Sequence, residues 1–255
     1  MKSVVMAGGK GTRLSPYTKI LPEPLMPIGD MPILEIMLRQ MRRAGISEVI
    51  LTVGHLAHLL QAFFQDGSHL GLKINYSFEE IPLGTAGPLS LIQGLDQTFM
   101  VSNGDVLTTL DLSDLFAYHQ EHQGIATIAA HMRTIHIDLG VLQTNMEQEL
   151  NGYIEKPDYN FFVSMGIYVF EPRILEYIPY NQRLDLPDLI LKLISAGEKV
   201  FSYRFDGYWM DLGRIGDYEQ AVNDFKQMKP LFLVDGEEPE KVQIPRRINH
   251  VEAAD

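Results

Sequence analysis

The chain has 255 residues, of which 45% are hydrophobic and 21% charged, and its formal net charge at neutral pH is −12. These values are ordinary for a globular protein with a sizeable core, and the acidic balance argues against nucleic acid or an anionic membrane as a partner. The chain has no cysteine, which excludes disulfides, thiolate metal sites and a cysteine nucleophile. The first apolar run is too short for a signal peptide and no later segment reaches membrane-spanning length, so we expect a cytoplasmic protein.

The first half of the chain alternates short buried runs with amphipathic segments. The buried runs predict strands at 3–6, 49–53, 72–78 and 99–102, and the amphipathic segments predict helices at 31–44, 55–64, 85–94 and 112–122. We expect Asp30 to cap the first helix and Asp111 the last. This alternation is typical of a largely parallel sheet with helices on both faces.

The second half is richer in strands. Its patterns predict strands at 125–131, 139–143, 152–155, 162–170 and 200–205, and helices at 186–196 and 215–228. We therefore predict an α/β fold with a mixed, mainly parallel sheet flanked by helices and a β-rich second half. We expect one domain over residues 1–228, followed by an acidic, proline-punctuated tail or extension at 229–255.

The sharpest motif is the glycine-rich segment GGKGTRL, which directly follows the first predicted strand at residues 8–14. Glycines there allow the backbone to approach a phosphate and to point amide N–H groups at it, and Arg13 adds a planar fork suited to phosphate oxygens. Leu14 occupies the third glycine position of a dinucleotide-binding motif, which disfavours a nicotinamide-dependent oxidoreductase, and the segment lacks the ending of a P-loop.

Several motifs together resemble the sugar-phosphate nucleotidyltransferases, also called NDP-sugar pyrophosphorylases. They are GGKGTRLSPYT (8–18), PEPLMPIGDMPILE (22–35), LGTAGPL (83–89), NGDVL (103–107), EKP (155–157) and WMDLGRIGDY (209–218). They follow the order of the family over roughly residues 1–226, and the chain resembles short members, similar to mannose-1-phosphate guanylyltransferases. The resemblance implies a Rossmann-like domain of the nucleotide-diphospho-sugar transferase type.

The resemblance also implies a reaction, partners and a metal ion. An oxygen of a sugar 1-phosphate attacks the α-phosphorus of a nucleoside triphosphate and releases pyrophosphate, with Mg²⁺ stabilising the developing charge. The implied metal ligands are Asp105 and Asp211, and Lys156 would contact the sugar phosphate. The implied contacts to the nucleotide come from Ala7, Gly8, Gly9, Gly11, Thr12, Gly84 and Thr85, and those to the sugar come from Asn103, Gly140, Glu155 and Gly166.

The resemblance also implies that Glu79, five residues before the glycine of the LGTAG segment, reads the base. A carboxylate only accepts hydrogen bonds, so it suits the N1–H and amino group of guanine, whereas an amide would suit uracil or thymine. The hypothesis favoured here is GTP, with an acidic solvated loop at Glu79 and Glu80 as the alternative. The segment Ser164-Met165-Gly166 departs from the Asn-Ala-Gly of many relatives, so the sugar is left open.

The chain departs from the family pattern at Glu23, where relatives carry a lysine in the setting P-K-P-L. That lysine is expected to stabilise charge on the phosphates, and loss of one such group costs about 3–4 kcal/mol. Two hypotheses follow. The chain is a nucleotidyltransferase that uses Arg13, Glu23 and Lys156 at its catalytic centre, or it is a catalytically impaired homologue that binds nucleotide and regulates a partner. Apolar, methionine-rich stretches permit a homodimer.

Overall fold

The structure is a computed structural model and describes residues 1–9 and 11–233. Its helices are α1 (Ile33–Arg43), α2 (Ala57–Phe64), α3 (Leu112–His122), α4 (Leu186–Ser195) and α5 (Ile215–Phe232). The central sheet has the strand order β12 (Val200–Phe205), β8 (Ala126–His136), β11 (Asp158–Phe170), β6 (Phe99–Asn103), β1 (Lys2–Met6), β4 (Glu48–Val53), β5 (Lys73–Phe78). Short paired strands are β2 (Pro27–Ile28) with β3 (Met31–Pro32), β7 (Val106–Thr108) with β13 (Trp209–Asp211), and β9 (Val141–Thr144) with β10 (Leu150–Ile154).

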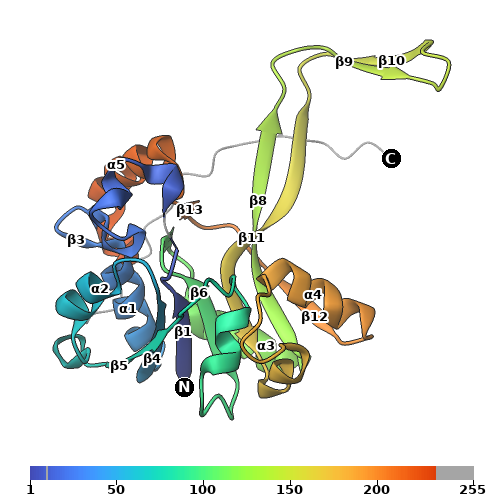
Figure 1. The fold of residues 1–255 in the computed structure, drawn as a ribbon. Coiled ribbons are helices and arrows are strands. Elements are labelled where there is room, and N and C mark those ends of the chain that lie inside the picture. The colour runs from blue at the N-terminus through green and yellow to red at the C-terminus, as the bar shows by residue number, and fades with distance from the viewer. Residues whose placement is uncertain (10, 234–255) are drawn as a thin grey trace.

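The central sheet is mixed and mainly parallel, as the alternation in the sequence predicts. β1 lies between β4 and β6 and is parallel to both, while β11 is antiparallel to β6 and β8. Adjacent residues of β1 enter different apolar cores because side chains alternate across a strand: Val5 packs with α1, α2 and α3, and Val4 packs with α4. Helices therefore cover both faces of the sheet (Figure 1), and the predicted α/β class is confirmed.

Two predicted details of the first half are wrong. Asp30 does not cap α1, because Met31 and Pro32 form β3 and the helix begins at Ile33; the Asp30 carboxylate instead accepts from Lys229 Nζ at 2.9 Å. The helix predicted at 85–94 is a five-residue 3₁₀ turn, Gly87–Leu91, because glycine and proline in this stretch disfavour an α-helix. The predicted cap of α3 is confirmed, since Asp111 Oδ1 accepts from the N–H of Ser113 at 2.9 Å.

α5 extends past the boundary expected for the domain. The helix has a kink with non-helical backbone at Met228, the residue where the expected domain ends, and helical structure resumes up to Phe232. The Phe232 ring is fully buried against Phe225, and Gln40 Nε2 donates to the Phe232 carbonyl at 3.3 Å. The rest of the predicted tail, residues 234–255, lies outside the described residues. No helix within the described part of the chain is long and apolar enough to cross a membrane.

A long antiparallel arm leaves the sheet between β8 and β11. The pairing of β12 with β8 ends at His131, and the pairing of β6 with β11 ends at Ile167. Beyond these points β8 and β11 pair only with each other and carry the hairpin β9–β10 at their end, so that the arm stands away from the body (Figure 1). We call residues 132–162 the arm. The sequence predicts the two strands of the terminal hairpin, at 139–143 and 152–155. It ends the strand before them at 131 and begins the strand after them at 162, so the paired stretches 132–136 and 158–161 are not predicted.

Candidate functional site

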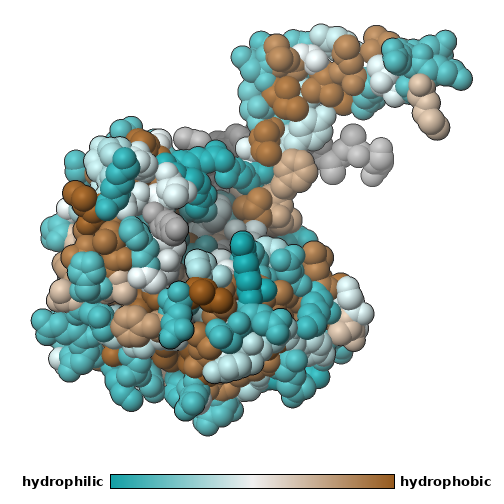
Figure 2. Space-filling model, viewed as in Figure 1, coloured by the Kyte–Doolittle hydropathy of each residue, from teal (hydrophilic) through white to brown (hydrophobic). Residues whose placement is uncertain are grey.

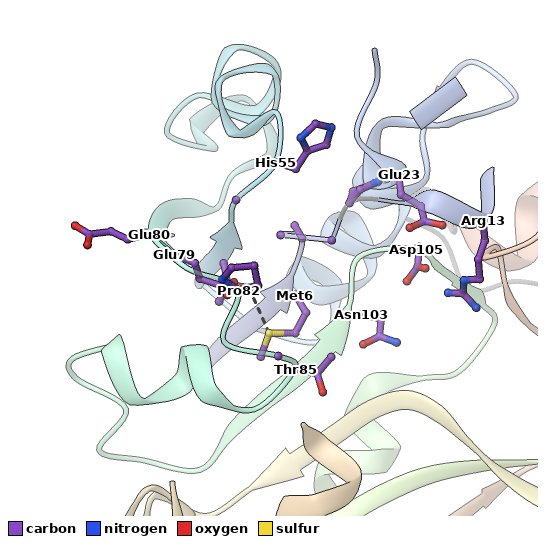
Figure 3. Close-up of a pocket in the computed structure, with 17 residues that line it drawn as sticks. Met6, Arg13, Glu23, His55, Glu79, Glu80, Pro82, Thr85, Asn103 and Asp105 are labelled. Carbon is purple, nitrogen blue, oxygen red and sulfur yellow. Dashed lines mark hydrogen bonds between the residues drawn. The ribbon is translucent and has the colours of Figure 1, made fainter. Parts of the chain in front are cut away.

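A cavity of about 660 Å³ opens at the carboxyl ends of β1, β4, β5 and β6. Parallel strands place their carboxyl ends at one edge, which is where ligands bind in sheets of this kind. The lining residues that the sequence predicts as functional are Ala7, Gly8, Gly9, Arg13, Glu23, Glu79, Gly84, Thr85, Asn103 and Asp105. The close-up shows them gathered around one hollow, with Glu23, Asp105 and Arg13 on the same side (Figure 3).

The glycine-rich segment crosses the floor of this cavity directly after β1. A Cβ at Gly9 would meet no atom within 4 Å, so the backbone there faces open space, and Gly11 has a left-handed backbone with φ of 57°. Gly11 and Thr12 do not line the cavity but form the turn that presents Arg13 to it. The arrangement leaves room for phosphate oxygens beside backbone amides and one guanidinium.

The two aspartates predicted to bind metal come from strands that are far apart in the sequence. β7 follows Asp105 and pairs antiparallel with β13, which places Asp211 opposite Val106 and therefore next to Asp105. The N–H of Leu212 donates to the Asp105 carbonyl at 3.2 Å, and Trp209 Nε1 donates to the Met165 carbonyl at 3.0 Å. These bonds fix β13 against β7 and β11.

Glu23 joins these carboxylates from a short 3₁₀ turn. Its Oε1 atom is buried without a hydrogen-bond partner among the described residues. Burial, followed by the nearby charge of Asp105, raises the pKa of Glu23 to about 7, and the Arg13 guanidinium opposes this shift. Burial and the charge of Asp211 raise the pKa of Asp105 to about 6. Among the described residues, three carboxylates therefore face one guanidinium at this site.

Mg²⁺ fits the pair Asp105 and Asp211. Both offer hard oxygen ligands, and the raised pKa of Asp105 reflects a carboxylate that a cation would stabilise. Among the residues that the structure describes, no group of three or more side chains is assembled to hold a metal ion. Mg²⁺ in proteins is commonly held by one or two carboxylates together with water and substrate phosphates.

Glu79 and the loop at 83–87 form the opposite wall. Glu79 Oε2 accepts from the N–H of Leu83 at 2.9 Å, while its other oxygen faces Gly8, and burial raises the pKa of its carboxyl. Thr85 makes two hydrogen bonds to the start of α4. Its N–H donates to Asp185 Oδ1 at 3.1 Å, and its hydroxyl accepts from the N–H of Leu186 at 2.7 Å. The loop is therefore pinned to α4 before any ligand binds.

The predicted sugar site is divided between the cavity and the arm. Asn103 lines the cavity, and a Cβ at Gly166 would lie 2.6 Å from Asn103 Nδ2, so these two residues are together. Gly140, Glu155 and Lys156 lie on the arm and do not line the cavity. Lys156 Nζ lies 3.3 Å from Asp138 of the arm, in an exposed ion pair.

Sequence reasoning missed several lining residues, namely Met6, Pro24, Thr52, Gly54, His55, Glu80 and Pro82. Thr52, Gly54 and His55 lie at and after the end of β4, next to the glycine-rich segment, and Gly54 lets its backbone approach Gly8 closely. Their position at the carboxyl end of a strand adjacent to β1 is the signal that could have identified them.

The chain is similar to a known protein family over most of its length. Residues 2–228 match the nucleotidyl transferase family. The chain is 36% identical over 244 residues to the UTP–glucose-1-phosphate uridylyltransferase of Synechocystis, with 87% of this chain and 62% of that protein covered. It is 33% identical over 228 residues to the mannose-1-phosphate guanylyltransferase of Mycobacterium tuberculosis, with 87% and 64% covered. The chain thus spans less than two thirds of the length of these two relatives.

Solved structures share the fold at low identity. HddC from Yersinia pseudotuberculosis superposes with a TM-score of 0.68 at 23% identity, covering 88% of this chain and 99% of that one. A UDP-glucose pyrophosphorylase superposes with a TM-score of 0.67 at 20% identity, covering 89% and 98%. Together with the match over nearly the whole described chain, these findings show that the chain belongs to the nucleotidyl transferase family.

Proposed function

We propose that this chain transfers a nucleoside monophosphate from a nucleoside triphosphate to a sugar 1-phosphate and releases pyrophosphate. The observation that carries the proposal is that Arg13 and Asp105 line, together with Gly8 and Gly9, a cavity large enough for a nucleotide, and that strand pairing places Asp211 next to Asp105. Asp211 itself is not among the residues that line the cavity. A Cβ at Gly213 would lie 2.5 Å from the Arg13 guanidinium, so the arginine lies over the segment that follows Asp211.

In this reaction an oxygen of the sugar phosphate attacks the α-phosphorus, a new P–O bond forms, and the bond to the departing pyrophosphate breaks. Asp105 and Asp211 would hold Mg²⁺, which supplies charge stabilisation to the phosphates. Arg13 would bind phosphate oxygens, and the amides of Gly8 and Gly9 would orient the triphosphate. Asn103 and Gly166 would lie against the sugar, because Gly166, within β11, is adjacent to Asn103 at the end of β6.

The preferred base is proposed to be guanine. The support is Glu79 Oε1, the oxygen that faces Gly8 while Oε2 accepts from Leu83. A carboxylate oxygen only accepts hydrogen bonds and so matches the N1–H and amino group of guanine. Two relatives carry guanylyltransferase names, the structure of HddC was also solved with GMP-PN, and the Synechocystis relative is named a uridylyltransferase.

A second candidate is a nucleotide-binding regulator with impaired turnover. Its support is Glu23, whose Oε1 atom is buried and whose carboxyl lies near Asp105, at the position where the family resemblance implies a lysine. A carboxylate in place of lysine removes a positive charge from the phosphate site and repels the phosphate oxygens.

One experiment separates the two candidates. Pyrophosphate release is measured with Mg²⁺ for GTP, UTP, dTTP, CTP and ATP against a panel of sugar 1-phosphates, in the wild type and in Glu23→Lys. Turnover by the wild type with one pair establishes the enzyme and names its substrates. A silent wild type with an active Glu23→Lys establishes the regulator, and silence of both rejects nucleotidyl transfer for this chain.

A further inference from the structure

The cavity has two ends of different chemistry. Arg13 and Asp105 lie together on one side of it, where the glycine-rich segment makes its turn (Figure 3). On the other side, a Cβ at Gly8 would lie 3.0 Å from Glu79 Oε1 and 3.4 Å from the backbone nitrogen of Gly54. A nucleotide whose phosphates lie at the Arg13 end therefore has its base near Glu79 and Gly54.

His55 directly follows Gly54 and carries the single aromatic ring among the described residues that line the cavity. Its strand ends beside that of Glu79, since the N–H of Glu79 donates to the Val53 carbonyl at 3.2 Å. The residue is exposed, and the close-up shows its ring beyond the end of β4, at the rim of the hollow (Figure 3). An aromatic ring next to a base site is suited to stacking, because every nucleobase has a π-face.

A tight turn fixes the position of His55. The N–H of Ala57 donates to the Gly54 carbonyl at 3.3 Å, which makes His55 and Leu56 the two central residues of the turn. Leu56 has φ of 56° and ψ of 27°, a left-handed backbone that is unfavourable for leucine and that glycine or asparagine adopts more readily. Strained residues of this kind cluster at functional sites, where the surrounding structure holds them in place. The turn therefore holds His55 at the cavity in a conformation that the local sequence does not favour.

Other exposed aromatic side chains of the described chain do not line the cavity. Tyr153, Phe161 and Phe162 belong to the arm, whose apolar side chains stand away from the body (Figure 2). Phe78 is 53% exposed and adjoins Glu79 in the sequence, but it is not a lining residue. Among the described residues, His55 is therefore the aromatic side chain that a base in the cavity can reach.

We propose that His55 is a specificity-determining residue whose ring stacks on the nucleobase, while Glu79 binds the edge of the same base. The two contacts read different properties. The carboxylate distinguishes guanine from a base that lacks its donors, and the stack favours a purine over a pyrimidine because a purine offers the larger face. The inference rests on the proposed function for the presence of a nucleotide in the cavity, but its tests need no turnover.

The first test measures the dissociation constants of GTP and UTP by calorimetry, with Mg²⁺ and without a sugar phosphate. We expect His55→Ala to weaken GTP binding by roughly tenfold or more, because the stack is lost, and to weaken UTP binding less. His55→Phe keeps the ring and should retain most of the affinity, whereas His55→Asn keeps hydrogen-bonding groups without the ring and should behave as His55→Ala does. The matched control is His58→Ala, since His58 is an exposed histidine of α2 that does not line the cavity.

The second test uses inorganic tripolyphosphate, which carries phosphates without a base and so separates stacking from a phosphate contact. We expect the same affinity for tripolyphosphate in the wild type and in His55→Ala. In proton NMR spectra, the ring signals of His55 are assigned by their loss in His55→Ala. They should move upfield with GTP and stay in place with tripolyphosphate, because the ring current of a stacked base shields the protons beneath it.

The outcomes separate this inference from the proposed function. Equal GTP affinities in the wild type and in His55→Ala overturn the inference and leave the proposed function standing. An equal loss for tripolyphosphate also overturns it, since that loss means that His55 acts on the phosphates or supports the glycine-rich segment. Rescue by His55→Asn but not by His55→Phe shows a hydrogen bond in place of a stack and overturns it too. A wild type that binds neither nucleotide rejects the proposed function, and the inference with it.

Discussion

At the scale of single residues, Glu23 shapes the electrostatics of the cavity. Its Oε1 atom is buried and has no hydrogen-bond partner among the described residues, and burial together with the charge of Asp105 raises its pKa from 4.5 to about 7. The folded protein therefore binds a proton at Glu23 between about pH 4.5 and pH 7 that the unfolded chain has already released. Such a group opposes folding as the pH rises through this window.

We expect the stability of the metal-free wild type to fall from pH 5 to pH 8, in part because of Glu23. In Glu23→Gln the decline should be shallower, and the remaining slope belongs partly to Asp105, whose pKa is raised to about 6. The measurement is the midpoint of thermal unfolding in EDTA at half-unit steps of pH. Equal slopes for the two proteins contradict the assignment of this effect to Glu23.

Glu79 is the second residue whose substitution should have a measurable effect, here on the choice of nucleotide. Glu79→Gln keeps an oxygen that can accept from the N–H of Leu83, so the loop is retained, but it replaces a carboxylate oxygen near Gly8. A hydrogen bond to a charged group contributes about 1.5–3 kcal/mol, so we expect the preference for GTP over UTP to drop by roughly tenfold or more. The ratio of kcat/KM for the two nucleotides measures this, and an unchanged ratio rejects Glu79 as the base reader.

At the scale of elements, the position of the nucleotide loop depends on α4. The Thr85 hydroxyl accepts from the first N–H of this helix, and the carboxylate of Asp185 accepts from Thr85 in return. An interaction of this kind satisfies an orphan N–H at the helix start and at the same time fixes the loop. The cavity wall and the helix are therefore one cooperative unit.

Thr85→Val tests this coupling, because valine keeps the shape and removes the acceptor. We expect a loss of about 1 kcal/mol in the free energy of unfolding, together with weaker nucleotide binding because the loop is freed. Urea unfolding and a nucleotide titration give the two quantities. Thr85→Ser retains the hydroxyl and serves as the control; a loss of the same size in both variants would point to packing instead of the cap.

At the scale of the whole molecule, α5 closes the fold over the segment that holds Asp211. Phe225 is 1% exposed, its ring lies 5.4 Å from that of Phe232, and a Cβ at Gly29 would approach it to 3.0 Å. Gln40 of α1 donates to the carbonyls of Thr108 and Phe232, which ties β7 to the end of α5. Residues of α5 thus pack back on residues of the first forty.

Phe225→Ala removes the centre of this contact. We expect it to cost about 3–5 kcal/mol, as for other buried phenylalanines, with a smaller cost for Phe225→Leu. The free energy of unfolding in urea gives the value. A cost below 1 kcal/mol for Phe225→Ala would show that α5 contributes little to the stability of the domain.

The sequence by itself determined the family, the α/β alternation and most of the residues that line the cavity. These follow from local signals: strand and helix periods, the glycine-rich segment, and motifs whose positions after strands bring them to one edge of the sheet. The tertiary structure decided which residues meet. Antiparallel pairing of β7 with β13 joined Asp211 to Asp105, and long pairing of β8 with β11 carried Glu155 and Lys156 away from Asn103. The burial of Glu23 likewise depends on distant residues. Strand pairing and burial are set by contacts between segments far apart in the chain, and no local pattern encodes their register.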